Sequence, residues 1–343
     1  MTPHKKTAMW RKHGLLYLGN DVSEDSPIAL SAETLAVSQV HMLGPIGSGK
    51  TMGMLQIAEP LLLDPDASVV AVDLKPGGGD IFHKLRDFCF AYGLTDRLDL
   101  LDFSNQEIVT GFAPMMPNGL IPTAHAKKIR SQFRAGVGQT SFDDTRQLSK
   151  WMFIALYSSR LLEMDLLEAW EILLPGSSLR RRILPRIPDP FLKRELQYLE
   201  SLSPARQDQL VSSSIALLEQ VIADAYIRPF LTHRPGLNIK HSLQQRRHVL
   251  INLGHDAPLS IDDVRILGRM IVNEIVTSVF ANQGKFGPTY LILDECHLSL
   301  SRDISLALDT GRSKGLRCFL INQYLGQLLE EDGSHVLFDS VMS

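Results

Sequence analysis

The sequence has few cysteines, almost no net charge and no long apolar run. Its three cysteines, Cys89, Cys296 and Cys318, are odd in number and lack the spacing of a metal-binding motif. This usage predicts a reduced, cytoplasmic compartment. No apolar stretch approaches the roughly 18–20 residues of a membrane-spanning helix, and the first residues lack the apolar core of a signal peptide. We therefore expect a soluble chain without a membrane span, which could associate with a membrane only through partners.

The charged residues nearly balance, with a formal net charge of −3 over 343 residues. This balance excludes an overall polycation, so any DNA-binding surface must be local. Three basic clusters are candidates for contacts to DNA phosphates, with a solvated surface as the alternative for each: Arg180-Arg181-Arg182 with Arg186, Lys127-Lys128 with Arg130, and Arg246-Arg247. We interpret a further basic group at the start of the chain as a solvated terminus rather than a DNA-binding arm: Lys5, Lys6, Arg11 and Lys12.

One glycine-rich segment, Gly44 to Thr51, has the form G-x-x-x-x-G-K-[ST] of a phosphate-binding loop. An expected buried strand over 38–43 precedes it, and an expected helix beginning near 52 follows it. In that context the loop places backbone N–H groups and a helix N-terminus against a phosphate. We expect Lys50 to reach the β- and γ-phosphates of ATP and the Thr51 hydroxyl to bind Mg²⁺. The expected nucleotide-binding residues are Gly44, Gly47, Ser48, Gly49, Lys50 and Thr51. The alternative is a chance Gly/Ser turn.

The remaining apolar segments predict an α/β fold. Nearly continuous apolar strands alternate with amphipathic helices on both sides of a long interruption, which predicts a mostly parallel sheet covered by helices. From about 115 to 240 the alternation stops and helical spacing takes over, so we expect an inserted all-α subdomain. The expected divisions are an N-terminal strand or hairpin arm (1–34), a first segment of the nucleotide-binding core (35–114), the helical insertion (115–240) and a second segment of the core (241–343).

A second acidic motif follows the insertion. Tyr290 to Glu295 reads as a buried strand that ends in two carboxylates, as in a Walker B element. We expect Asp294 to bind Mg²⁺ and Glu295 to orient or deprotonate the attacking water. His297, just beyond, is interpreted as structural.

Two further residues are catalytic candidates, each with an alternative. Gln323 ends the next strand, where its amide could sense the γ-phosphate or simply be a polar strand end. Arg312 could reach the nucleotide of a neighbouring subunit as an arginine finger, or it could be a surface cation at the end of a helix.

The order of these motifs resembles the HerA/FtsK superfamily of ring-forming P-loop ATPases, and most of all the ATPase domain of conjugative (type IV secretion) coupling proteins. The segments that carry the resemblance are Gly44 to Thr51, Asp73-Leu74-Lys75-Pro76-Gly77, Phe112-Ala113-Pro114-Met115, Asp294-Glu295, Gly311 to Leu316 and Asn322 to Leu328. The resemblance implies a RecA-like P-loop NTPase fold, hexameric rings with nucleotide at subunit interfaces, Gln323 as a sensor and Arg312 as a finger acting in trans. It also implies movement of DNA through a central channel.

Family members usually carry N-terminal transmembrane helices and further core strands beyond the position of Ser343. We therefore expect a C-terminally shortened core, and a monomer as the alternative to the hexamer. The leading functional hypothesis is an Mg-ATP-dependent motor that moves DNA without sequence preference, together with a relaxase or secretion apparatus. Two alternatives stay open: a HerA-like repair or defence ATPase with a nuclease partner, and a non-hydrolysing adaptor that uses nucleotide to order a protein-binding surface.

Overall fold

The computed structural model describes residues 2–37, 39–75, 77, 80–136, 146–234, 236–281, 287–300 and 310–328. The chain divides into two compact units, which we call the core unit (Met1–Asn105 with Asn238–Ser343) and the helical unit (Gln106–Leu237). The core unit contains α1 (Pro3–His13), β1 (Leu15–Asn20), β2 (Pro27–Ser31), α2 (Ala32–Val37), β3 (Val40–Leu43), α3 (Lys50–Leu62), β4 (Ser68–Asp73), α4 (Ile81–Ala91), η1 (Thr95–Arg97), β5 (Leu98–Asp102), α12 (Ile239–Gln244), β6 (His248–Asn252), α13 (Ile261–Phe280), β7 (Thr289–Asp294), η4 (Cys296–Leu298), η5 (Arg312–Lys314), β8 (Leu316–Asn322) and η6 (Leu325–Leu328).

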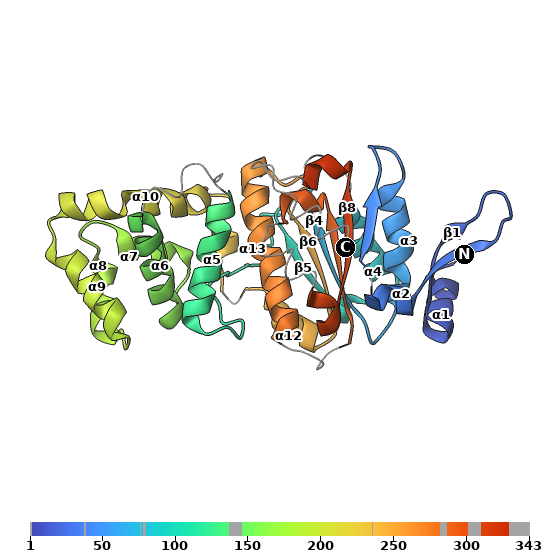
Figure 1. Ribbon diagram of the computed structural model, residues 1–343, viewed down its shortest axis with the longest axis horizontal. Coiled ribbons are helices and arrows are strands. Elements are labelled where there is room, and N and C mark those ends of the chain that lie inside the picture. Colours follow the sequence, from blue (N-terminus) through green and yellow to red (C-terminus); the bar gives the residue numbers. More distant parts are fainter. Residues whose placement is uncertain are drawn as a thin grey trace. The chain divides into compact units, whose positions relative to one another are not determined.

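The core unit is built on a six-stranded sheet with the strand order β3-β8-β7-β4-β6-β5. Every pair of neighbours in it is parallel, which confirms the predicted α/β class. The strands β4, β6 and β7 are buried along their whole length, because α3 and α4 cover one face of the sheet and α13 covers the other (Figure 1). Parallel strands all end at the same edge, and this carboxyl edge is where α/β folds place their ligands.

The strand before the glycine-rich loop differs from the prediction. We expected a buried strand over 38–43, whereas β3 is half-buried and Leu43 at its end is 41% exposed. The reason is its position, because β3 lies at the margin of the sheet and pairs only with β8 among the described residues. The ring of His41 also hydrogen-bonds Asn322 on β8, which ties the two strand ends together.

The N-terminal residues form more than the predicted arm. A hairpin of antiparallel β1 and β2 is present, and the basic residues before it form helix α1. Lys5, Arg11 and Lys12 are exposed, as expected of solvated charges, but Lys6 is not. Lys6 is 3% exposed, and its Nζ donates to Glu59 Oε2 on α3 at 2.7 Å. Trp10 is also buried, and its indole N–H donates to Asp64. The solvated interpretation is therefore wrong for Lys6, which is held by an ion pair, while Trp10 anchors the helix.

The helical unit contains α5 (Pro122–Gly136), α6 (Arg146–Leu161), α7 (Leu166–Leu173), α8 (Ser178–Ile183), η3 (Leu184–Arg186), α9 (Pro190–Ser201), α10 (Pro204–Ile222) and α11 (Arg228–Thr232). It starts at Gln106, earlier than the expected 115. Backbone bonds explain the difference: Phe112 N–H donates to Phe230 O at 2.5 Å, and Leu237 N–H donates to Gly111 O at 2.6 Å. The segment that leads into the helical unit is thus hydrogen-bonded to the segment that leads out of it. None of the described helices has the length and apolarity required to cross a bilayer.

Candidate functional site

The glycine-rich loop connects β3 to α3 at the carboxyl edge of the sheet. Gly47 and Gly49 have φ of 81° and 87°, a left-handed conformation that costs glycine little. Gly49 is the N-cap residue of α3, which begins at Lys50, so the loop turns directly into a helix N-terminus. The ammonium of Lys50 donates to the carbonyl of Gly44 and, at 3.0 Å, to that of Pro45. Lys50 therefore lies folded over its own loop, whose residues 45–49 are exposed.

Helix α3 holds this loop against the sheet. Its inward face is apolar and fully buried, with Met54, Ile57, Ala58, Leu61 and Leu62 each 1% exposed or less. Thr51 is the second residue of the helix and is half-buried beside the exposed Ser48. The loop and the first turn of α3 thus lie at the carboxyl edge of the sheet, where a phosphate-binding loop is expected.

Two aspartates end adjacent strands at the same edge. Asp73 and Asp294 are register partners at the ends of β4 and β7, and they are 0% and 3% exposed. Burial, followed by the neighbouring charges of Asp73 and Glu295, raises the pKa of Asp294 to about 7. Burial also raises the pKa of Asp73, although three backbone N–H groups oppose that rise. Buried carboxylates this close repel one another unless a cation neutralises them.

Asp73 was not among the predicted site residues. Its Oδ2 accepts the N–H groups of Ile81 and Phe82 at 3.1 and 3.4 Å, and its Oδ1 accepts the N–H of Lys75 at 3.2 Å. It therefore fixes the start of α4 and the turn after β4. The sequence does carry a signal, because Asp73 follows a buried apolar strand in the same way as Asp294 does.

Glu295 and Gln323 meet across the ends of β7 and β8. Gln323 Nε2 donates to Glu295 Oε1 at 3.0 Å. Glu295 is 3% exposed and has a φ of 51°, and its Oε2 makes no hydrogen bond within the described part of the chain. His297 Nδ1 lies 3.6 Å from that oxygen, and burial lowers the pKa of His297, so the neutral ring does not neutralise the carboxylate. Oε2 of Glu295 is thus the oxygen that Gln323 leaves unoccupied.

Only β8 separates the loop from the acidic strand end. Leu43, the last residue of β3, pairs with Asn322, and Leu293 pairs with Leu320. Neighbouring strands lie about 4.8 Å apart, so β3 and β7 are separated by roughly 10 Å. A bound nucleoside triphosphate with its metal ion can bridge that gap. The loop around Lys50 and the carboxylate of Asp294 therefore share one edge of one sheet.

The structure does not locate the arginine-finger candidate. The backbone of Arg312 begins η5, but its side chain lies outside the described residues. A role for Arg312 in trans thus stays a prediction.

The basic clusters predicted as DNA contacts are partly used within the fold. Arg180 is 0% exposed, and its guanidinium donates to Glu200, Gln207 and two backbone carbonyls. Arg247 forms a two-bond pair with Asp99 at 2.8 and 2.9 Å, and Arg246 pairs with Asp66. Both precede β6 and lie at the amino edge, away from the loop. Arg180 is buried and fits neither the DNA-contact nor the solvated reading. Arg247 is half-buried, whereas Arg246, Arg181, Arg182, Arg186 and Lys127 are exposed, and their contact to DNA stays a prediction.

No protein-family model and no curated protein matches the sequence. Solved structures do match in fold. The bacterial conjugative coupling protein TrwB, in its unbound form, superposes with a TM-score of 0.62 at 17% identity over 99% of this chain and 74% of that chain. TrwB in complex with the ATP analogue ADPNP gives a TM-score of 0.64 at 17% identity over 99% and 76%. VirB4 of Thermoanaerobacter pseudethanolicus gives 0.57 at 10% identity over 95% and 81%. The chain thus has the fold of the conjugative coupling protein TrwB and of VirB4, and the resemblance expected from the sequence is confirmed at the level of the fold.

Proposed function

We propose that this protein is an Mg-ATP-dependent motor ATPase of the conjugative coupling type, which moves DNA through a homo-hexameric ring. The observation that carries the proposal is the shared sheet edge, where a glycine-rich loop and three buried carboxylates, Asp73, Asp294 and Glu295, come together. TrwB supports it, since that protein was solved with ADP and Mg²⁺ and with nucleotide analogues.

The residues present fit an Mg²⁺-bound triphosphate. Buried carboxylates with raised pKa, such as Asp73 and Asp294, provide the hard oxygen donors that Mg²⁺ prefers, usually together with bound waters. The Thr51 hydroxyl is the expected ligand from the loop side. Mg²⁺, when bound, neutralises phosphate charge during phosphoryl transfer.

The side chains then have separable tasks. Gly44 to Thr51 bind the phosphates through backbone N–H groups, and Lys50 exchanges its loop carbonyls for phosphate oxygens. Glu295 accepts a proton from the attacking water through the oxygen that Gln323 does not occupy. Gln323 is the sensor of the hydrolysis state, since its amide already donates a hydrogen bond to the carboxylate of Glu295. In the hexamer, Arg312 of a neighbouring subunit completes the site.

The exposed cations of the basic clusters are the residues that contact DNA. Arg181, Arg182, Arg186 and Lys127 lie on the surface of the helical unit. Arg181 also bonds the carbonyls of Gly176 and Ser177 and lies 3.6 Å from Glu200. Exposed cations of this kind suit contacts to the phosphate backbone irrespective of sequence.

The test is the steady-state ATPase rate with and without DNA. We expect Mg²⁺-dependent hydrolysis that rises several-fold with DNA and loses this stimulation between about 50 and 200 mM salt. The double variant Arg181→Ala/Arg182→Ala should lose part of the stimulation and keep the DNA-free rate, and Lys50→Ala should lose all hydrolysis. Equal rates at every DNA concentration would contradict the motor. No hydrolysis in any condition, with nucleotide still bound, would favour the adaptor instead.

A further inference from the structure

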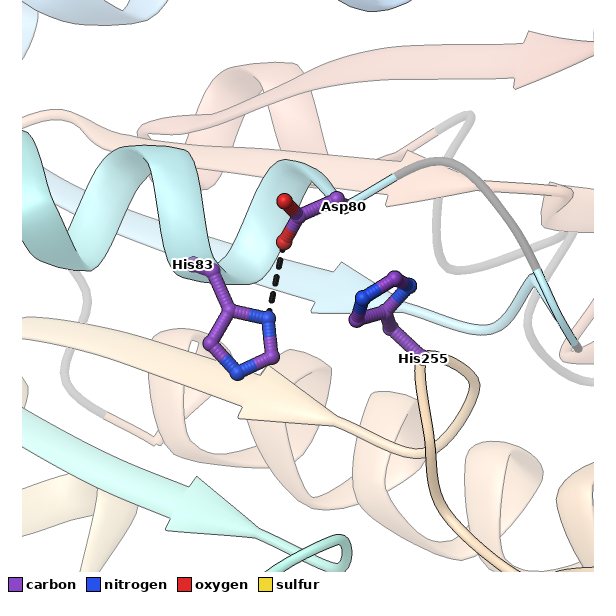
Figure 2. Close-up of side chains that lie close together, drawn as sticks. All are labelled: Asp80, His83 and His255. Carbon is purple, nitrogen blue, oxygen red and sulfur yellow. Dashed lines mark hydrogen bonds and ion pairs between the residues drawn. The ribbon is translucent and has the colours of Figure 1, made fainter.

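A second cluster of ligand-type side chains lies at the same sheet edge, outside the proposed nucleotide site. Asp80 and His83 stand at the start of α4, and His255 lies on the loop after β6 and faces them (Figure 2). One ligand atom of each residue lies within 4.8 Å of those of the other two. The rings of His83 and His255 are 5.2 Å apart between centroids. The three side chains are between 22% and 34% exposed, so an ion can enter from solvent.

Asp80 does not have the usual role of its position. It is the N-cap residue of α4 but makes no side-chain cap bond, and its φ of 45° is left-handed. An N-cap aspartate normally accepts the N–H groups of the first turn. Here Asp73 accepts the N–H groups of Ile81 and Phe82. The Asp80 carboxylate is therefore turned to His83, whose Nδ1 lies 2.7 Å away.

The loop that carries His255 is fixed independently. The Asn252 side chain accepts the N–H groups of Gly254 and His255 and donates to the carbonyl of His255. Gly254 packs so tightly on the backbone of Lys75 that no Cβ would fit there. The ring of His255 is available for a ligand. Its Nδ1 has no hydrogen-bond partner among the described residues, and its Nε2 lies 3.4 Å from the exposed Asp256.

We propose that Asp80, His83 and His255 form a binding site for a divalent transition-metal ion, with Zn²⁺ as the representative ion. Two imidazoles and one carboxylate leave a fourth position for water, as in open zinc sites. Ligands about 2.0–2.2 Å from a tetrahedral ion are about 3.3–3.6 Å apart, so ligand atoms that now lie within 4.8 Å of one another need to approach by up to about 1.5 Å. The ion takes the place of the hydrogen bond between Asp80 and His83. The imidazole donors distinguish this site from the all-oxygen site that Mg²⁺ prefers.

Such an ion would join the start of α4 to the loop after β6. Both segments border Asp73, because Ile81 N–H bonds its carboxylate and Leu253 N–H bonds its carbonyl. The metal would therefore brace the part of the sheet edge that carries Asp73. It would act as a structural clamp that is separate from the ion bound with nucleotide.

The experiment uses the full-length, tag-free chain treated with a chelator and then titrated with Co²⁺ or Zn²⁺ in excess Mg²⁺. We expect about one equivalent of Co²⁺ to give the visible absorption of a tetrahedral site with nitrogen ligands. Zn²⁺ should displace it and raise Tm by about 5 °C at a hundredfold excess over Kd. His83→Gln, His255→Gln and Asp80→Asn should each weaken binding by tenfold or more, whereas His13→Gln, at an exposed histidine of α1, should change nothing.

The Tm of each variant is also measured without metal, which separates a loss of binding from a loss of folding. All three positions are partly exposed, so we expect the variants to fold. Asp294→Asn removes the proposed Mg²⁺ ligand and should leave the Co²⁺ absorption unchanged. The proposal of this metal site is therefore tested independently of the proposed nucleotide site. Absorption that persists in His83→Gln and His255→Gln, or that is lost in Asp294→Asn, would overturn the proposal. So would the absence of any tetrahedral Co²⁺ band in the unmodified chain.

Discussion

Replacing Glu295 by glutamine is expected to lower the steady-state ATPase rate by about 10²–10⁴-fold, the usual contribution of a positioned general base. Glutamine keeps the oxygen that accepts from Gln323 Nε2, so the local packing is conserved. It cannot take up the proton of the attacking water. Nucleotide affinity should stay close to that of the unmodified chain, because Glu295 is assigned to the chemical step and not to binding.

The matched control is Glu33→Gln, at an exposed carboxylate on α2, which should leave both rate and affinity unchanged. The measurement is a coupled ATPase assay together with equilibrium binding of a fluorescent ATP analogue. A Glu295→Gln protein that turns over ATP at the normal rate would show that another group is the base. Loss of affinity along with rate would mean that Glu295 acts in binding.

Replacing Asp294 by asparagine is expected to stabilise the nucleotide-free core unit at neutral and alkaline pH. The folded-state pKa of Asp294 is raised from 3.8 to about 7, so the folded chain holds this proton more tightly than the unfolded chain. The stability due to the protonated carboxyl is complete below about pH 4 and is lost as the pH rises through 7. Asparagine does not ionise, so the variant should gain up to about 4 kcal/mol above pH 8 and almost nothing near pH 4.

The readout is a urea titration at several pH values, followed by hydrogen exchange in peptides from β4 and β7. Asp87→Asn, at an aspartate that is 65% exposed, should change the free energy of unfolding by less than about 0.5 kcal/mol. An Asp294→Asn variant that is equally stable or less stable at pH 8 would contradict the buried, mutually repelling carboxylates. When Mg²⁺ and nucleotide are added, the free energy of unfolding of the unmodified chain at pH 8 should rise to that of the Asp294→Asn variant.

Much of the sheet and the phosphate loop could be predicted from local pattern. The strands β4 and β7 are nearly continuous apolar runs, as is β8 beyond Arg317, and each run ends at a polar residue. The glycines of the loop occur where the backbone needs a left-handed φ, as at Gly47 and Gly49. Such features depend on a few neighbouring residues, so a single sequence carries them.

Other features depend on register and tertiary packing. That Asp73 lies beside Asp294 follows from the pairing of β4 with β7, which no local pattern gives. Lys6 and Arg180 read as solvated charges, but ion pairs with Glu59 and Glu200 allow them to be buried. The cluster of Asp80, His83 and His255 joins segments far apart in the chain, so its spacing matches no sequence motif.

The most direct test is a double-mutant cycle between Lys50 and Asp294, read as affinity for a fluorescent ATP analogue with Mg²⁺ and with chelator. The account predicts that Mg²⁺ tightens binding to the unmodified chain by about tenfold or more, or at least about 1.4 kcal/mol. Asp294→Asn should lose most of that increment and keep the metal-free affinity. Lys50→Ala should weaken binding in both conditions, and the double variant should be little worse than Lys50→Ala, since both residues hold one ligand. An Asp294→Asn protein that retains the full Mg²⁺ increment would contradict a shared site.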